Sequence, residues 1–242
     1  MAAILNVNGV GKRFGGLQAL SDVSFVVEPA TVVGLMGPNG AGKTTLFNVI
    51  AGVYAPDQGA VLLNGVNICG WRTNRICRAG IGRTFQITKP FANLTVLETV
   101  RIGALNHSAH LRAATREAEM VLDRVGLLDK REQLGKQLTV VERKRLEVAR
   151  ALATRPHLLL LDEVAAGLRP HEIEQIGDLV RSLAREGIAI LMIEHVVQAL
   201  MSVSSHIILL DHGEILAEGP PDVIVRDPKV IDVYLGQETA VA

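Results

Sequence analysis

Short apolar segments alternate along most of the chain with segments of helical periodicity. The clearest apolar segments are residues 31–36, 158–161 and 188–193, which are almost free of polar residues and rich in Val, Ile or Leu. Segments of this kind are typical of parallel strands that are buried on both faces. The pattern therefore predicts an α/β fold built on a parallel sheet.

Alternation of apolar and polar positions predicts further strands outside this sheet. Segments 4–9 and 23–27 are predicted strands, separated by a turn at residues 14–16. Segment 60–68 is predicted to be a hairpin because Asn64-Gly65 is a strong turn signal. An antiparallel β-layer is thus expected beside the sheet. A last hairpin, residues 206–217, is expected before the closing helices.

The middle of the chain has helical spacing without an intervening strand. Residues 94–105 and 113–125 are predicted helices, and a third is predicted from residue 138 to about residue 153. Thr139 and Glu142 form a capping box at the start of the third helix. Such a start is either purely structural or a place where free N–H groups meet an anion. We therefore expect a helical insert.

Length and composition narrow the class of protein. At 242 residues, the chain can form one large α/β domain or a domain with a substantial insert. Lys and Arg together number 25, as do Asp and Glu, so we expect no nucleic-acid partner. The arginines at 72, 75 and 78 predict a short helix with one solvated basic stripe.

Two observations concern the cellular compartment. No apolar run approaches the roughly 18 residues that a membrane span needs, and the first residues lack the charged and apolar regions of a secretory signal. Cys69 and Cys77 lack metal-ligand spacing, so we expect both to be reduced. The cytoplasm is the expected location.

A glycine-rich stretch directly follows the strand at residues 31–36. Its glycines allow backbone N–H groups to close around phosphate oxygens, and a following helix would turn its positive end to them. A lysine can then reach the β- and γ-phosphates, and a hydroxyl can ligate Mg²⁺. A turn that binds nothing is the alternative, but strand, loop and helix occur in the right order for a phosphate loop. The stretch is Gly37-Pro38-Asn39-Gly40-Ala41-Gly42-Lys43-Thr44-Thr45.

Polar residues at the ends of the other buried strands are candidates for catalysis. Asp162 and Glu163 follow four leucines, where one acid can hold Mg²⁺ and the next can deprotonate a water. His195 follows segment 188–193 and can donate to a γ-phosphate. Gln86 ends a predicted strand over residues 81–85. Phe14 is either a core aromatic, which the pattern favours, or a flat face for an adenine ring.

These motifs resemble those of ABC transporter ATP-binding subunits, and the resemblance covers almost the whole chain. The shared motifs are the phosphate loop, Gln86, residues 138–142 and 158–163, and His195. Within that superfamily the chain resembles the branched-chain amino-acid importer ATPases, through residues 13–16, 80–86, 165–168, 227–229 and 234–236.

The resemblance implies the ABC ATPase fold. In that fold a RecA-like P-loop core with an antiparallel β-subdomain is interrupted by a helical subdomain. The whole chain, 1–242, would be one ABC ATPase domain. Residues 1–87 and 157–242 would form the core, and residues 88–156 the helical subdomain.

The resemblance also implies roles for single residues. Phe14 would stack on adenine, against the interpretation from the pattern alone. Gln86 would sense Mg²⁺ and water, and Asp162 would bind the metal together with Thr44. Glu163 would be the catalytic base and His195 would contact the γ-phosphate. Thr139 would serve the nucleotide of a partner subunit.

The partners implied are those of a membrane transporter. A second ATPase subunit, identical or different, would sandwich two ATP molecules and drive transmembrane permease subunits at the cytoplasmic face of the membrane. A periplasmic or extracellular substrate-binding protein would be an indirect partner. The transported solute would be a branched-chain or similar amino acid.

The chain departs from the family pattern in four places, one of them a stretch of several residues. The usual signature Leu-Ser-Gly-Gly-Gln is replaced by residues 138–142, Leu-Thr-Val-Val-Glu. Val164 replaces a proline, and Arg169 and Val196 each replace an aspartate. Two other hypotheses therefore stay open: an export-type or soluble ABC ATPase, and a regulatory nucleotide-binding module that switches without turnover.

Overall fold

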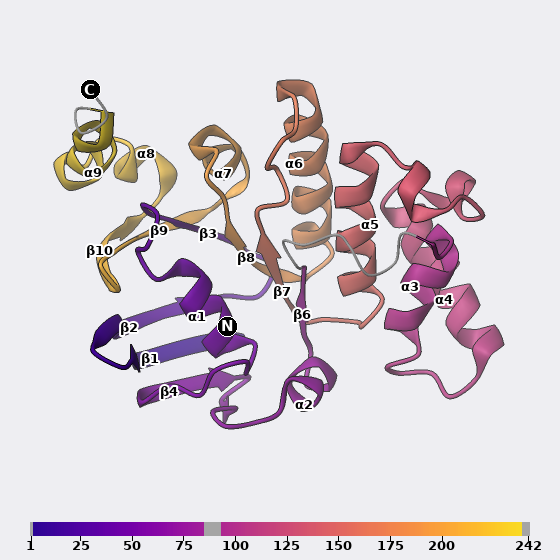
Figure 1. The fold of residues 1–242 in the computed structure, drawn as a ribbon, viewed down its shortest axis with the longest axis horizontal. Coiled ribbons are helices and arrows are strands. Elements are labelled where there is room, and N and C mark those ends of the chain that lie inside the picture. The colour runs from indigo at the N-terminus through magenta and orange to yellow at the C-terminus, as the bar shows by residue number, and fades with distance from the viewer. Residues whose placement is uncertain (1, 85–92, 239–242) are drawn as a thin grey trace.

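The computed structural model describes residues 2–84 and 93–238, which form two sheets and several helices (Figure 1). The larger sheet is six-stranded and positions the candidate site. Its strands, in spatial order, are β10 (Glu214–Gly219), β9 (His206–Asp211), β3 (Val32–Met36), β8 (Ala189–Ile193), β7 (Leu158–Asp162) and β6 (Ile81–Arg83). All neighbouring pairs are parallel except β9 and β10.

The central strands are buried on both faces, as their sequences predict. In β7, Leu158 and Leu160 belong to one hydrophobic cluster, whereas Leu159 and Leu161 belong to the other. None of these four side chains is exposed, because helices cover one face and the second sheet lies beyond the other. Of the predicted strand 81–85, β6 covers Ile81–Arg83, and residue 85 lies outside the described residues.

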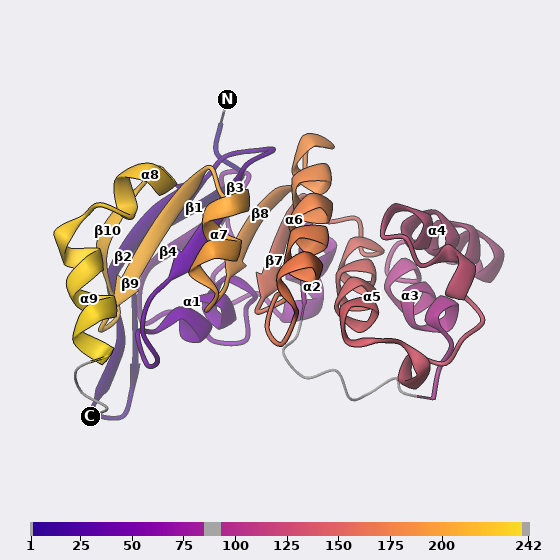
Figure 2. The same ribbon diagram turned by 90° about the horizontal axis from the view of Figure 1, so that it is seen from above.

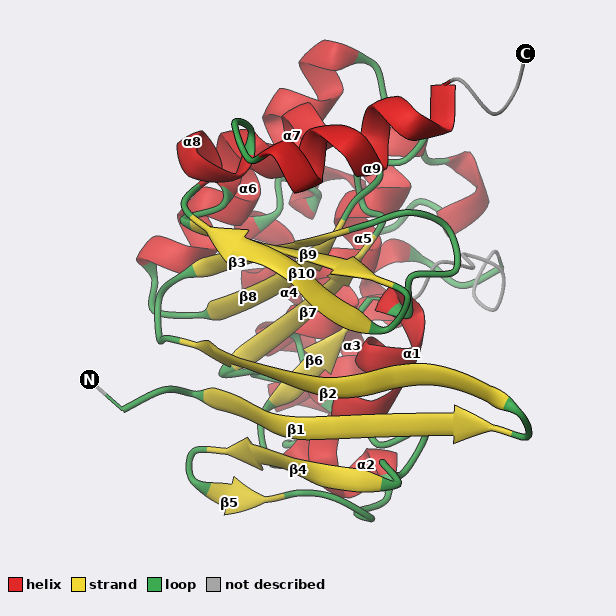
Figure 3. Cartoon of the chain, turned by 90° about the vertical axis from the view of Figure 1, so that its left-hand side faces the viewer, coloured by secondary structure: helices red, strands yellow, loops and turns green. Residues whose placement is uncertain are grey.

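The second sheet is antiparallel and four-stranded, with the order β2-β1-β4-β5 (Figure 3). Its strands are β1 (Leu5–Phe14), β2 (Leu17–Val27), β4 (Gln58–Leu63) and β5 (Val66–Asn67). The turn at Asn64-Gly65 is confirmed, and both residues have positive φ (49° and 76°). Strands β1 and β2 are longer than predicted, because polar positions with one face in solvent still pair in the ladder.

Helices flank the six-stranded sheet on both faces. Helix α1 packs between the two sheets, and α6 and α7 pack on the opposite face. The bounds are α1 (Lys43–Ile50), α2 (Thr73–Arg78), α6 (Pro170–Arg185), α7 (Val197–Val203), α8 (Pro221–Ile224) and α9 (Pro228–Glu238). Helix α6 was not among the predicted elements, although apolar residues recur along it at helical spacing.

Three further helices gather at one end of the molecule (Figure 2). They are α3 (Val96–Ala104), α4 (Leu111–Arg124) and α5 (Val140–Leu152), with short 3₁₀ helices at Leu128–Lys130 and Gly135–Gln137. Their ends all lie within two residues of the predicted ones. Within the described residues, no helix is both long and apolar enough to cross a membrane, and Cys69 and Cys77 are free thiols.

Candidate functional site

The glycine-rich loop joins β3 to α1, and its glycines are required by close backbone approaches. A Cβ on Gly37 would lie 2.0 Å from the Leu210 carbonyl oxygen, and one on Gly42 would lie 2.6 Å from the Ala19 oxygen. Both glycines have positive φ, 147° and 103°. A Cβ on Gly40 would meet nothing within 4 Å, so this part of the loop faces open space. The loop is therefore held on one side and accessible on the other.

Backbone hydrogen bonds fasten the loop to both sheets. The Gly213 N–H donates to the Ala41 carbonyl at 3.0 Å, and the Ser21 N–H donates to the Gly213 carbonyl at 2.8 Å. The turn between β9 and β10 is thereby tied to the loop and to β2. A pocket of about 410 Å³ adjoins the loop and is lined by Pro38, Asn39, Gly40, Ala41, Asp211, His212 and Val233.

The Lys43 side chain turns back over the loop. Its Nζ donates to the carbonyls of Gly37 and Pro38 at 2.6 and 2.8 Å. The residue is only 6% exposed, and this burial lowers the pKa of Lys43, although Glu163 and Asp162 act to raise that pKa. The next two residues, Thr44 and Thr45, are exposed and half-buried. A cation and a hydroxyl are thus present where a phosphate group would need them.

Asp162 ends β7 and is 4% exposed. Its Oδ2 accepts a hydrogen bond from Arg83 Nη2 at 3.0 Å, and its N–H donates to Thr84 Oγ1 at 2.9 Å. Arg83 therefore holds the carboxylate of Asp162 and Thr84 holds its main chain, both from the end of the neighbouring strand, β6.

Glu163 follows Asp162 in a left-handed backbone conformation, with φ of 51°. For a residue with a side chain this conformation costs about 1–3 kcal/mol, and such strain is concentrated at functional sites. Glu163 Oε1 lies 2.7 Å from His195 Nε2, and the Glu163 carbonyl accepts from Lys144 Nζ at 2.8 Å. The ends of β7 and β8 thus bring two of the predicted catalytic side chains, Glu163 and His195, into contact.

Glu194 is a third carboxyl in this region. It is 2% exposed, and its Oε1 accepts from the Ala165 N–H at 2.7 Å. Burial raises the pKa of Glu194 to about 7, with a further increase from Glu163 and Asp162. The carboxyl anchors the loop after β7 directly beside the Glu163–His195 pair.

Two other predicted residues, Phe14 and Thr139, lie outside this group. Phe14 ends β1 with 41% exposure, so the pattern-based interpretation as a core residue is wrong: the β1–β2 hairpin extends past the core. The Phe14 ring meets Tyr54 edge-on at 5.1 Å. Thr139 is exposed at the start of α5. Gln86 lies outside the described residues.

The structure adds Arg83, Lys144 and Asn48 to the predicted set. Arg83 Nη1 donates to Asn48 Oδ1 at 2.6 Å, which ties β6 to α1. The sequence held one signal for Arg83, which is a charged residue at the end of an apolar strand, three positions before Gln86. Lys144 gave no such signal, because its contact depends on how α5 packs beside β7.

The sequence of the chain is similar to those of known protein families. Residues 20–166 match the family described as ABC transporter, and residues 214–240 match the one described as branched-chain amino acid ATP-binding cassette transporter. The chain belongs to the ABC transporter ATP-binding family. This ABC ATPase shares the family's nucleotide-binding fold and enzyme class, which the phosphate loop and the acids after β7 had indicated.

Two relatives have similar sequences over their whole length. The high-affinity branched-chain amino acid transport ATP-binding proteins LivG of Escherichia coli (strain K12) and BraF of Pseudomonas aeruginosa are each 38% identical to this chain over 250 aligned residues. Each alignment covers 97% of this chain and 98% of the relative.

A solved structure agrees in fold. The ADP conformation of MJ1267, an ATP-binding cassette of an ABC transporter, aligns with a TM-score of 0.90 at 30% identity. The alignment covers 98% of this chain and 100% of that chain. The predicted ABC ATPase fold is therefore confirmed.

Proposed function

We propose that this ABC ATPase hydrolyses ATP to power an importer of branched-chain or similar amino acids. The observation that carries the proposal is that Lys43, at the start of α1, Asp162 and the Glu163–His195 pair gather at one edge of the six-stranded sheet. The solute class rests on the 38% identity to the branched-chain amino acid transport proteins LivG and BraF.

The residues present fit ATP and Mg²⁺. The loop would surround the phosphates with N–H groups, and Lys43 would exchange its bonds to loop carbonyls for phosphate oxygens. The Thr44 hydroxyl and the Asp162 carboxylate are oxygen donors of the kind that Mg²⁺ prefers. When bound, Mg²⁺ would neutralise developing phosphate charge. Gln86 would be the third residue near this metal.

Glu163 is assigned the role of general base. Its carboxylate would take a proton from the attacking water, while the contact with His195 fixes its orientation. On nucleotide binding, His195 would turn a ring N–H towards the γ-phosphate. The exposed Phe14 ring, which makes an edge-on contact with Tyr54, would stack on the adenine ring.

The assignments of subunits and location follow from the same proposal. Transmembrane permease subunits would bind this chain at the cytoplasmic face of the membrane, and a second ATPase subunit, identical or different, would complete two composite sites. A periplasmic or extracellular substrate-binding protein would deliver the solute. In this scheme residues 88–156 act as the helical subdomain and the rest of the chain as the core.

One assay separates this function from its alternatives. ATP hydrolysis is measured for the purified chain alone, and again with its partner ATPase and permease subunits in membrane vesicles. An importer subunit predicts hydrolysis that rises when permeases and a branched-chain amino acid are supplied. Hydrolysis indifferent to permeases would support a soluble ATPase, and binding without hydrolysis in either preparation would support a switch module.

A further inference from the structure

Arg83 joins the acid at the end of β7 to helix α1. One guanidinium nitrogen, Nη2, donates to Asp162 Oδ2 at 3.0 Å, and the other, Nη1, donates to Asn48 Oδ1 at 2.6 Å. The side chains of Arg83 and Asp162 are only 10% and 5% exposed. The guanidinium also lies 5.8 Å from the centre of the Phe47 ring, on the same helix as Asn48. The Arg83 guanidinium is therefore held by contacts with both β7 and α1.

A buried carboxylate is costly unless it is paired and hydrogen-bonded. Arg83 supplies that pairing and also restricts the orientation of the carboxylate, since a planar guanidinium donates in fixed directions. With Oδ2 engaged by Arg83, Oδ1 of Asp162 has no hydrogen-bond partner among the described residues and is the oxygen available to a metal ion. Lysine has the same charge, but its single ammonium nitrogen lacks the planar pair of nitrogens that holds two acceptors in fixed directions.

We propose that Arg83 is a positioning residue for the metal site, which orients Asp162 so that one carboxylate oxygen is held by the protein and the other binds Mg²⁺. The inference rests on the proposed function, because it takes Asp162 as a metal ligand. Removing a group that orients a metal ligand typically costs about 10–100-fold in metal affinity or activity.

Asn48 is the anchor of this arrangement. Its main-chain carbonyl accepts hydrogen bonds from the N–H groups of Val53 and Tyr54, at 2.8 and 3.2 Å. The Tyr54 ring in turn contacts the Phe14 ring. The Arg83–Asn48 bond therefore connects the acid at the end of β7 with the segment that supports the proposed adenine face. Asn48→Ala leaves the Arg83–Asp162 ion pair in place but removes one of the two fixed directions.

If Arg83 only compensated the charge of Asp162, its loss would affect metal binding differently than if Arg83 orients the carboxylate. A cation that only offsets the Asp162 charge would repel Mg²⁺, so its removal would tighten metal binding. An orienting group instead makes metal binding weaker when it is lost. Arg83→Lys separates the two effects, because it retains the charge and loses the fork.

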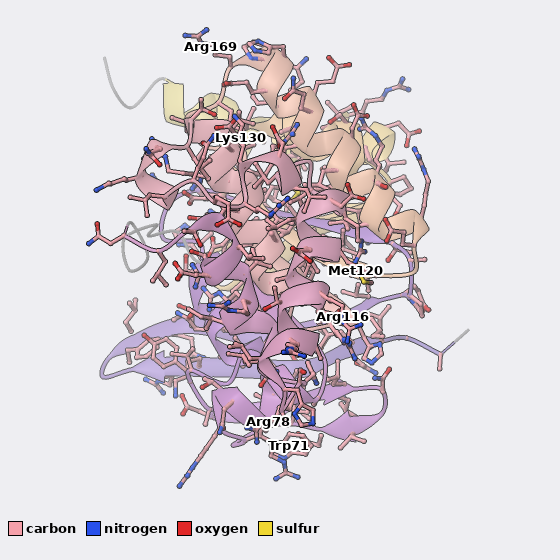
Figure 4. The ribbon with its side chains drawn as sticks, turned by 90° about the vertical axis from the view of Figure 1, so that its right-hand side faces the viewer. Trp71, Arg78, Arg116, Met120, Lys130 and Arg169 are labelled. Atoms are coloured by element: carbon pink, nitrogen blue, oxygen red, sulfur yellow. The ribbon has the colours of Figure 1, made fainter. Side chains whose placement is uncertain are left out.

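The first experiment needs neither metal nor nucleotide. Arg83→Met should lower the Tm of the apo protein by about 6 °C or more, because it leaves the Asp162 carboxylate buried and unpaired. The same change in an Asp162→Asn background should lower the Tm by less than half as much. Arg78→Met, at an exposed arginine of α2 (Figure 4), is the matched control and should leave the Tm nearly unchanged. Equal Tm losses in the two backgrounds would overturn the coupling.

The second experiment measures metal binding directly. Mn²⁺, which favours the same oxygen ligands as Mg²⁺, is titrated into the ADP complex and followed by electron paramagnetic resonance. Arg83→Met, Arg83→Lys and Asn48→Ala should each raise the half-saturating Mn²⁺ concentration, by about 10-fold for the arginine variants. ADP affinity in EDTA should change less than 2-fold.

The outcomes are separable. If the wild type binds Mn²⁺ and the Arg83 variants bind it equally or more tightly, the inference is overturned and the proposed function stands. If the wild-type ADP complex itself binds no Mn²⁺, the metal site of the proposed function fails, and the inference fails with it.

Discussion

Three carboxyl groups stand at the ends of β7 and β8, and their neighbours give each a different character. Asp162 is held by Arg83, Glu163 contacts His195, and Glu194 is buried against the Ala165 N–H. The sequence predicted the first two as functional because they follow an apolar strand beside a phosphate loop. Arg83 and Asp162 are 79 residues apart, so their pairing depends on strand order, which local pattern does not specify.

A first prediction concerns the pH dependence of Glu194. Its pKa is raised from 4.5 to about 7, so the folded state binds this proton more tightly than the unfolded state. The contribution of Glu194 to stability is therefore greatest at low pH and is lost as the pH rises through about 7. Lys144 opposes this shift, whereas Glu163 and Asp162 increase it.

The measurement is the Tm of the wild type and of Glu194→Gln at pH 6 and pH 8. The wild type should lose more Tm between these values than Glu194→Gln, which keeps an oxygen for the Ala165 N–H but cannot titrate. Glu174→Gln, at an exposed position on α6, is the control and should follow the wild type. Identical pH dependence in wild type and Glu194→Gln would refute the assignment.

At the scale of elements, the predicted and observed strands agree best where every residue of the strand is buried. The strands at 31–36, 158–161 and 188–193 were predicted because each residue of a doubly covered strand must be apolar. The sequence pattern does not predict the full lengths of β1 and β2, because strands with one face in solvent tolerate the same polar residues as a loop. Phe14 was misplaced for the same reason: its position in the pattern resembles a core position, but the hairpin carries it past the core.

The start of α5 shows a predicted feature in full. Thr139 Oγ1 accepts from the Glu142 N–H at 3.4 Å, and Glu142 Oε2 accepts from the Thr139 N–H at 2.9 Å. Glu142 Oε1 also forms an ion pair with Lys130, which ends the 3₁₀ helix Leu128–Lys130 and is labelled in Figure 4. The negative charge at this helix start is thus folded back and paired within the chain.

A second prediction follows from this cap. Thr139→Ala should lower the free energy of unfolding by about 1 kcal/mol, because the Glu142 N–H loses its acceptor. For a chain of this size that corresponds to a Tm decrease of about 2–4 °C. Thr139→Ser keeps the hydroxyl and should retain most of the wild-type Tm. A Tm for Thr139→Ala at or above that of Thr139→Ser would show that the box does not stabilise α5.

At the scale of the whole molecule, the six-stranded sheet gathers the site from distant parts of the chain. Its strand order places β8 between β3 and β7, so the phosphate loop, Glu163 and His195 lie at one edge. The altered signature lies on another element, at the start of α5. There Val140 presents a branched, 48% exposed side chain where the family pattern has a glycine.

A third prediction concerns a heterodimer with an ATPase subunit that carries the usual Leu-Ser-Gly-Gly-Gln. The phosphate loop of this chain would face the ordinary signature, and the partner's loop would face residues 139–142. Lys43→Ala should therefore reduce turnover more than the matching lysine change in the partner. Val140→Gly with Val141→Gly should raise activity at the partner's site alone. Comparable losses from the two lysine variants in a purified heterodimer would refute this asymmetry.

The central claim is that Lys43 holds phosphate whereas Glu163 carries out the chemistry, and paired measurements of ATP affinity and turnover test it most directly. Glu163→Gln should bind ATP with an affinity within about 3-fold of the wild type, yet its turnover should fall by about 10²-fold or more. The variant lacks the base but keeps the phosphate and metal contacts. Lys43→Ala should lose ATP affinity. An equal loss of ATP affinity in both variants would contradict the account.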